Sequence, residues 1–246
     1  MKRVIVYGDL HGCLEEFKAL RDKIGINSYD FEICVGDIIN KGPYLAHIMI
    51  SYMQDHNIKA VLGNNEIKSI KQYRQYLSKG EEYLKTLRPF EAATVLSLNS
   101  DDFSFLNSLP YFLKIKNLTV LHGGLTPFMS LDKLDCALKR EITLIRFLNE
   151  KFRPVLLSDQ KNHNKFWAEV YDGREGFIVS GHHPFKEPKI EKYAVDIDTG
   201  CVYGGKLTAI IFKKDDDNNF DTKNYEFVYQ KSKSDYWGNY LNGKQK

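Results

Sequence analysis

Five short apolar runs in this chain each end at a cluster of glycines and polar residues of metal-ligand type. The clusters occupy residues 8–12, 36–42, 63–66, 122–124 and 181–184. Short apolar runs of this kind are typical of buried strands. Polar side chains that lie just past strand ends can converge on one edge of a sheet. The pattern therefore predicts an α/β fold with a polar site at that edge.

The clusters contain side chains that suit a pair of divalent ions. Asp9 and His11 alternate in a loop flanked by glycines, so both can point at one ion, and Asp37 can bridge two ions. Mixed carboxylate, imidazole and amide ligands suit Mn²⁺, Fe or Zn²⁺ better than Ca²⁺. Such a pair of ions activates water near neutral pH and clamps the oxygens of a phosphate. The six candidate ligands are Asp9, His11, Asp37, Asn64, His122 and His182.

Composition limits the class of protein. Of the 246 residues, 43% are hydrophobic, which excludes wholesale disorder. The net charge of +3 arises from 35 basic and 32 acidic residues, so it gives no electrostatic argument for nucleic acid or a membrane as partner. No repeat or linker divides the sequence, and we expect residues 1–246 to form a single domain.

The termini and the cysteines indicate a cytoplasmic protein. The first apolar run begins directly after residues 1–3, which leaves no room for a signal peptide. No apolar stretch approaches the roughly 18 to 20 residues of a membrane span. The four cysteines form no CxxC pair, and we expect reduced thiols.

Helical periodicity places four helical segments between the clusters. Apolar residues recur at helical spacing over 14–24, with Gly25 as C-cap, and a further helix is expected over 45–56. Residues 66–110 predict a helical insertion beside the sheet, and residues 131–170 predict another mostly helical segment.

Strands return in the last third of the chain. They are expected over 177–180, 193–197, 206–212 and 225–229. The tail after about residue 230 is expected to be loosely held.

The order and spelling of the clusters resemble the calcineurin-like metallophosphoesterases. GDLHG, GDIINKGP, GNNE, HGG and GHHP are similar to the GDxHG, GDxxDRG, GNHE, HxG and GHxP blocks of that superfamily. Within it, the chain most resembles bacterial and phage PPP-type phosphatases and symmetrical diadenosine-tetraphosphatases. Residues 196–207 resemble their IDTG-x-V-x-GG-x-L stretch.

The resemblance implies a β-sandwich flanked by helices, with a dinuclear metal site at the C-terminal ends of the strands. It assigns Asp9 and His11 to the first metal and Asp37 to the bridge. It assigns the remaining ligands, Asn64, His122 and His182, to the second metal. It also implies hydrolysis of a phosphoester by a metal-bridging hydroxide.

The chain departs from the family pattern where the pattern concerns substrate chemistry. Asn65 stands where the family has the His that serves as general acid, and an amide cannot deliver a proton at neutral pH. Asn40 stands where protein phosphatases have the Asp that orients that His. Lys41 replaces the Arg of DRG, which keeps a charge for phosphate but loses the bidentate fork.

A second phosphate-binding Arg is expected shortly before the GHHP block, and the segment there carries Glu169 instead. Arg174 and Lys165 are the candidate substitutes. His183, the next residue after His182, is expected to face outward, because adjacent residues in extended chain point opposite ways.

The sequence leaves several functions open. The leading hypothesis is a metal-dependent phosphatase that favours good leaving groups, with an aryl phosphate, a nucleotide or a phosphoprotein as substrate. Dinucleoside-polyphosphate hydrolysis and phosphodiester cleavage are the enzymatic alternatives. A descendant that binds metal and phosphate without useful turnover is the non-enzymatic alternative.

Overall fold

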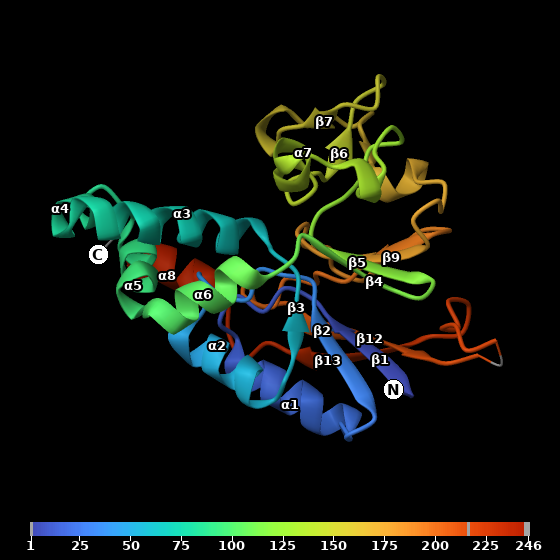
Figure 1. Ribbon diagram of the computed structural model, residues 1–246, viewed down its shortest axis with the longest axis horizontal. Helices are drawn as coiled ribbons and strands as arrows, with labels where there is room; N and C mark the ends of the chain where they lie inside the picture. The colour runs from blue at the N-terminus through green and yellow to red at the C-terminus, as the bar shows by residue number, and fades with distance from the viewer. Residues whose placement is uncertain (1, 216, 244–246) are drawn as a thin grey trace.

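Two five-stranded sheets stack face to face and form the centre of the protein (Figure 1). The computed structural model describes residues 2–215 and 217–243. The first sheet runs in the order β13 (Glu226–Lys231), β12 (Lys206–Lys213), β1 (Arg3–Tyr7), β2 (Asp30–Cys34) and β3 (Lys59–Ala60). The second runs in the order β10 (Lys189–Ile190), β11 (Ala194–Asp196), β9 (Phe177–Ser180), β5 (Leu118–Leu121) and β4 (Phe112–Ile115). This is the mixed α/β sandwich expected from the sequence.

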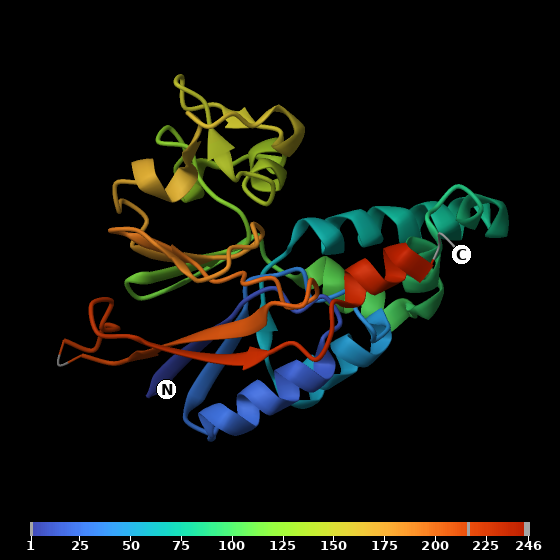
Figure 2. The same ribbon diagram turned by 180° about the vertical axis from the view of Figure 1, so that it is seen from behind.

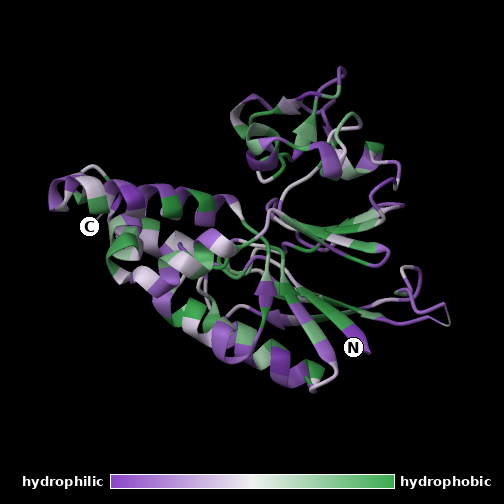
Figure 3. Cartoon of the chain, viewed as in Figure 1, coloured by the Kyte–Doolittle hydropathy of each residue, from purple (hydrophilic) through white to green (hydrophobic). Residues whose placement is uncertain are grey.

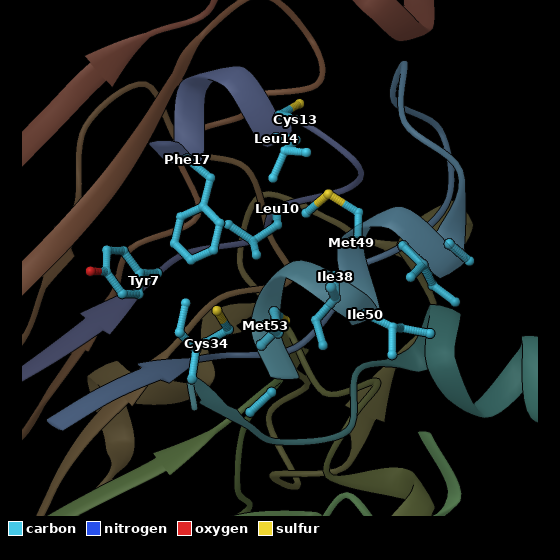
Figure 4. Packing of buried hydrophobic residues seen from close by; sticks show 14 of the residues in the cluster. Tyr7, Leu10, Cys13, Leu14, Phe17, Cys34, Ile38, Met49, Ile50 and Met53 are labelled. Atoms are coloured by element: carbon cyan, nitrogen blue, oxygen red, sulfur yellow. The ribbon is translucent and has the colours of Figure 1, made fainter. Parts of the chain in front are cut away.

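Strand β1 is apolar on both faces because both of its faces are covered. Val4 and Val6 enter the core between the two sheets, whereas Ile5 and Tyr7 enter the core under the helices. Figure 4 shows this second core, in which Tyr7 meets Phe17 edge to face with 4.9 Å between ring centroids. Figure 3, coloured by hydropathy, shows that the strands of both sheets are largely apolar.

Helix α1 (Leu14–Ile24) joins the parallel strands β1 and β2, and it ends at Gly25 in the left-handed conformation, as predicted. Helix α2 (Ala46–Asp55) leads from β2 to β3 and confirms the predicted second helix. The strands predicted over 177–180, 193–197, 206–212 and 225–229 correspond to β9, β11, β12 and β13.

The predicted helical insertion consists of four helices that lie beside the sandwich (Figure 1). They are α3 (Asn64–Lys79), α4 (Glu81–Leu84), α5 (Pro89–Ser97) and α6 (Ser100–Ser108). The chain after residue 230, expected to be loosely held, instead completes β13 and forms α8 (Tyr236–Gly243) against this insertion (Figure 2). Its aromatic residues explain the difference. Trp237 packs edge to face on Phe90, and the Tyr236 hydroxyl donates to Glu16 Oε1 at 2.7 Å.

The prediction of a mostly helical segment over residues 131–170 is wrong. Helix α7 (Cys136–Glu141) is its one α-helix within the described residues, accompanied by short 3₁₀ turns. The segment is otherwise a small lobe built on a three-stranded sheet, in the order β7 (Pro154–Val155), β6 (Phe147–Leu148) and β8 (Lys165–Phe166). Apolar residues of the segment fit a helical period, but the buried ones, such as Ile142, Ile145 and Leu148, pack with Trp167 as a separate core on the outer face of the second sheet. We call residues 125–172 the cap lobe.

None of the helices in the described part of the chain combines the length and apolarity that a membrane crossing requires. All four cysteines lie within the described residues and are free thiols.

Replacing Glu91 tests how the insertion is held together. Burial acts to raise the pKa of Glu91, but hydrogen bonds from Arg88 and Lys68 outweigh it and lower the pKa to about 2. A depressed pKa adds stability above the unfolded pKa near 4.5, and that stability disappears as the pH falls toward 2. We therefore expect Glu91→Gln to lower the free energy of unfolding by roughly 1–2 kcal/mol at pH 7 and by much less at pH 3. Urea unfolding of both proteins at each pH measures this, and a difference that does not change with pH would contradict it.

Candidate metal centre

The ends of five strands from the two sheets meet at one place. Loops after β1, β2 and β3 arrive from the first sheet, and loops after β5 and β9 arrive from the second. The ligand atoms of Asp9, His11 and Asp37 lie within 4.8 Å of one another, as do those of Asp37, His122 and His182. Asn64 Oδ1 lies 3.1 Å from His122 Nε2. The structure thus brings all six predicted ligands together, with Asp37 common to both groups.

Backbone conformation at the site is strained. Five non-glycine residues there have positive φ, a region that costs roughly 1–3 kcal/mol for such residues. They are His11 (44°), Asp37 (46°), Asn40 (73°), Lys41 (67°) and His182 (78°). Strain of this kind persists only where the surroundings hold the backbone in place.

Glu66 supplies much of that restraint. Its carboxylate is fully buried and accepts hydrogen bonds from four backbone N–H groups, those of Gly63, Asp37, Ile38 and Ile39, at 2.8–3.2 Å. One side chain on α3 therefore fixes both the loop after β2 and the loop after β3. Gly63 is required for this close approach, because a Cβ there would lie 2.3 Å from the backbone nitrogen of Asp37.

The three histidines are arranged as neutral ligands. His122 Nδ1 lies 2.9 Å from the carbonyl of Val35, and His11 Nδ1 lies 3.3 Å from that of Ile39. When Nδ1–H donates to the carbonyl, Nε2 is unprotonated and its lone pair is free to bind a metal ion. In both histidines Nε2 lies 3.4 Å from a carboxylate oxygen of Asp37. Burial lowers the pKa of His11 to about 3 and lowers the pKa of His122 and His182. All three are available as ligands at neutral pH.

The donor set fits two divalent cations. His182 Nε2 is buried with no hydrogen-bond partner in the described residues. Burial, with repulsion from Asp198 and Asp37, raises the pKa of Asp9 well above its ordinary value. Asp198 is buried as well, and burial raises its pKa to about 6. Gathered carboxylates with a spare imidazole nitrogen are the environment that positive ions stabilise.

A cavity of about 180 Å³ opens onto these side chains. Lys41 lines it, as the sequence predicted, with Nζ 3.2 Å from His11 Nε2 and 2.9 Å from the Tyr203 hydroxyl. Arg146 lines it from the cap lobe, and its guanidinium lies 3.3 Å from His182 Nδ1. Two cations therefore line the cavity, one beside His11 and one beside His182, an arrangement suited to a phosphate group.

Arg174, the candidate for the second phosphate-binding residue, does not line this cavity, whereas Arg146 does. Arg174 pairs with Asp172 at 2.6 Å and lines a different cavity, beside Phe128. Lys165 is exposed on β8 and does not line the site. The sequence does not single out Arg146, because its segment has a helical period; the one signal is an arginine inside the apolar run TLIRFL.

His183 differs from expectation too. It lines the cavity, half-buried, with its ring edge-on to Phe147 and Phe185 at centroid distances of 5.0 and 4.7 Å. The turn after β9 is responsible, because a positive φ at His182 breaks the alternation of an extended chain. Asp198 and Tyr203 also line the cavity and were not singled out from the sequence as site residues.

Asn65 and Asn40 lie next to the ligands and bind each other. Asn65 donates to Asp37 through its backbone N–H at 2.9 Å and its side-chain amide at 2.6 Å. Asn40 Nδ2 lies 3.4 Å from Asn65 Oδ1 and 3.1 Å from the Ser69 hydroxyl, and Thr94 donates to Asn40 Oδ1. Asn65 therefore orients the carboxylate that the two ligand groups share.

A family model described as calcineurin-like phosphoesterase matches residues 2–217. The chain belongs to the calcineurin-like phosphoesterases. It is accordingly a phosphoric ester hydrolase, and the family implies a dinuclear site for divalent metal ions at the ligand cluster described above.

Relatives of this phosphoesterase include proteins named bis(5'-nucleosyl)-tetraphosphatase PrpE [asymmetrical]. The protein of Oceanobacillus iheyensis is 27% identical over 230 residues, which cover 85% of this chain and 88% of the relative. That of Bacillus cereus (strain Q1) is 30% identical, with 83% and 88% covered. Their names carry the designation asymmetrical, whereas the sequence motifs resemble those of symmetrical diadenosine-tetraphosphatases.

Solved structures agree with this phosphoesterase fold. A crystal structure described as a candidate diadenosine tetraphosphatase superposes with a TM-score of 0.73 at 27% identity, covering 93% of this chain and 94% of the other. A protein serine/threonine phosphatase from Saccharomyces cerevisiae shares the fold, with a TM-score of 0.57 at 14% identity, covering 95% of this chain and 81% of the other.

Replacing Glu66 with Gln tests the restraint of the metal-binding loops. The amide NH₂ would face backbone N–H donors and leave at least one of them unpaired. We expect Glu66→Gln to lower the free energy of unfolding by about 2–4 kcal/mol and to weaken Mn²⁺ binding. Urea unfolding in chelator and calorimetric titration with Mn²⁺ measure the two effects. Glu82→Gln, at an exposed glutamate, is the matched control, and equal behaviour of the two variants would contradict the role of Glu66.

Replacing Arg146 tests phosphate binding. Loss of a charged donor at the cavity is expected to raise the KM for p-nitrophenyl phosphate, and the inhibition constant of inorganic phosphate, roughly tenfold or more in Arg146→Ala. Arg174→Ala is the matched control, because Arg174 lies outside the cavity. Steady-state kinetics of both variants with Mn²⁺ decide the matter; a larger effect in Arg174→Ala would reverse the assignment.

Proposed function

We propose that this phosphoesterase cleaves phosphate groups that carry good leaving groups, that dinucleoside polyphosphates are its substrates, and that it uses two Mn²⁺ ions. The observation that carries the proposal is Asn65, an amide fixed on Asp37 at the position of the family's general acid. The proposal concerns which phosphate compounds the enzyme turns over, since hydrolysis itself follows from the family.

The leaving group must depart without a proton from residue 65. General acid catalysis is typically worth 10²–10⁴-fold, so its absence penalises substrates whose leaving group is a strong base. A nucleoside polyphosphate departs as an anion whose own last pKa is near 6, as for other phosphate monoesters, and needs little help. The alkoxide of phosphoserine needs a proton. Asn65 therefore favours phosphoanhydrides and aryl phosphates.

The six ligands Asp9, His11, Asp37, Asn64, His122 and His182 would hold the two ions. Bound divalent ions would supply Lewis acidity toward phosphate oxygens and an activated water at neutral pH. The donors are oxygen and neutral imidazole nitrogen without thiolate, which suits Mn²⁺.

The chain's own residues then bind and orient the substrate. Lys41 and Arg146 both line the cavity and would neutralise the phosphate oxygens. Asn65 holds Asp37 in one orientation through two hydrogen bonds. Leu157 and Pro184 line the cavity beside His183 and give it some apolar surface.

The names of the relatives support the choice of dinucleoside polyphosphates, since they are called bis(5'-nucleosyl)-tetraphosphatases. Product analysis separates the modes of cleavage. A symmetrical dinucleoside tetraphosphate would give a nucleoside triphosphate and monophosphate in asymmetrical cleavage, or two diphosphates in symmetrical cleavage. Inertness toward these dinucleotides, with turnover of phosphotyrosine peptides or cyclic phosphodiesters, would transfer the assignment to a phosphoprotein or a diester substrate.

Restoring the acid tests the proposal. Position 40 faces position 65, so the double variant Asn40→Asp/Asn65→His supplies a histidine together with the carboxylate that would orient it. We expect the double variant to raise kcat for an alkyl phosphate at least tenfold, within the 10²–10⁴ range of general acid catalysis, and to change p-nitrophenyl phosphate turnover less.

Asp37→Asn serves as the inactive control for this experiment, because Asp37 belongs to both ligand groups. Wild-type rates that do not depend on leaving-group pKa would contradict the role given to Asn65. Absence of turnover by all three proteins, with tight binding of metal, would indicate a binding protein that has lost useful catalysis.

A further inference from the structure

A second cavity, of about 540 Å³, is lined by α3, by the segment from the end of α6 to β4, and by Arg140 of the cap lobe. Figure 1 shows α3 on one side of this region and α7 on the other. The cavity shares no lining residue with the metal centre, yet it adjoins it in sequence, because Leu62 lines the cavity and Asn64 lines the metal centre.

One face of α3 connects the two sites. Asn64, Ile67, Lys71 and Arg74 recur at helical spacing and therefore project on the same side. At a rise of 1.5 Å per residue, Lys71 is about 10 Å and Arg74 about 15 Å along the helix axis from Asn64. The cavity thus extends away from the metal centre along a single helix face.

The cavity is positively charged. Lys71, Arg74 and Arg140 line it, and no acidic residue does so. In the described part of the chain none of these three side chains forms an ion pair; Arg74 donates to Asn107 Oδ1 at 2.6 Å. Arg140 comes from α7, across the cavity from α3. Three cations without counter-charges, on two sides of one cavity, favour an anionic ligand.

The rest of the lining suits a nucleoside. Ile70 and Leu109 are buried and apolar, and Tyr111 is half-buried and lines the cavity as its aromatic residue. Gln75 and Asn107 supply amide groups that can hydrogen-bond the edge of a base. Apolar and aromatic surface with a few polar groups is typical of small-molecule sites.

We propose that this cavity binds the distal nucleotide of a dinucleoside polyphosphate while the reacting phosphate lies at the metal centre. This inference rests on the proposed function, and it assigns a binding site to the part of the substrate that does not react. The polyphosphate follows the Asn64–Arg74 face of α3, Lys71 and Arg74 bind its phosphates together with Arg140, and the base lies on the apolar side of the cavity.

The test compares substrates that do and do not reach the cavity. We expect Arg74→Ala and Arg140→Ala to lower roughly tenfold the ratio of kcat/KM for a dinucleoside tetraphosphate to kcat/KM for p-nitrophenyl phosphate. Lys79→Ala is the matched control, since Lys79 lies on the same helix but outside the cavity. Its ratio is expected to equal that of the wild type. A ratio unchanged in both arginine variants would overturn the inference while leaving dinucleotide hydrolysis intact.

A binding measurement keeps the inference testable if no dinucleotide is hydrolysed. Calorimetric titration with ADP in the presence of Mn²⁺ is expected to show roughly tenfold weaker binding in the two arginine variants than in wild type. That result without dinucleotide turnover would support a nucleotide site and defeat the proposed substrate. Equal ADP affinity in all proteins would overturn the inference. Equal affinity of the wild type for ADP and inorganic tripolyphosphate would overturn its nucleoside part.

Discussion

The site depends on one buried carboxylate that is not itself a metal ligand. Glu66 gathers four backbone N–H groups from two loops, and those loops carry Asp37 and Asn64. A carboxylate accepts several such bonds without needing a counter-cation nearby, because the N–H dipoles provide the positive potential. The strain at Asp37 is sustained for this reason, since the loop cannot relax without giving up hydrogen bonds that water does not replace in the interior.

A neutral network occupies the positions where the resemblance to the family predicts an acid and its partner. Asn65, Asn40, Ser69 and Thr94 exchange hydrogen bonds among themselves, and all four are buried. A carboxylate at position 40 facing an amide would be a buried charge without a partner, which is costly. An amide at position 65 therefore favours an amide rather than a carboxylate at position 40. Neither asparagine alters the six candidate ligands.

Much of this could be predicted from the sequence because it depends on local patterns. The strand-end clusters predicted six ligand positions that the fold brings together, and helical periodicity predicted α1, α2 and the insertion. The cap lobe could not be predicted in this way. Its apolar residues at 142, 145 and 148 match a helical period, yet they are buried by contact with Trp167 and the second sheet, which are distant in sequence. Arg146 was hidden by the same ambiguity, since its position in the cavity depends on how that lobe packs. The tail helix α8 likewise depends on aromatic contacts with Phe90, far earlier in the chain.

The ligands come from both halves of the sandwich. Asp9, Asp37 and Asn64 follow strands of the first sheet, whereas His122 and His182 follow strands of the second. Ions bound among them would act as a cross-link between the two sheets, in addition to the apolar core and to polar contacts such as that between His122 and the carbonyl of Val35. Any sliding of one sheet over the other would alter the spacing of the ions, and bound ions would resist such sliding. The thermal stability of the protein and its catalytic activity would then both increase with the concentration of free metal ion.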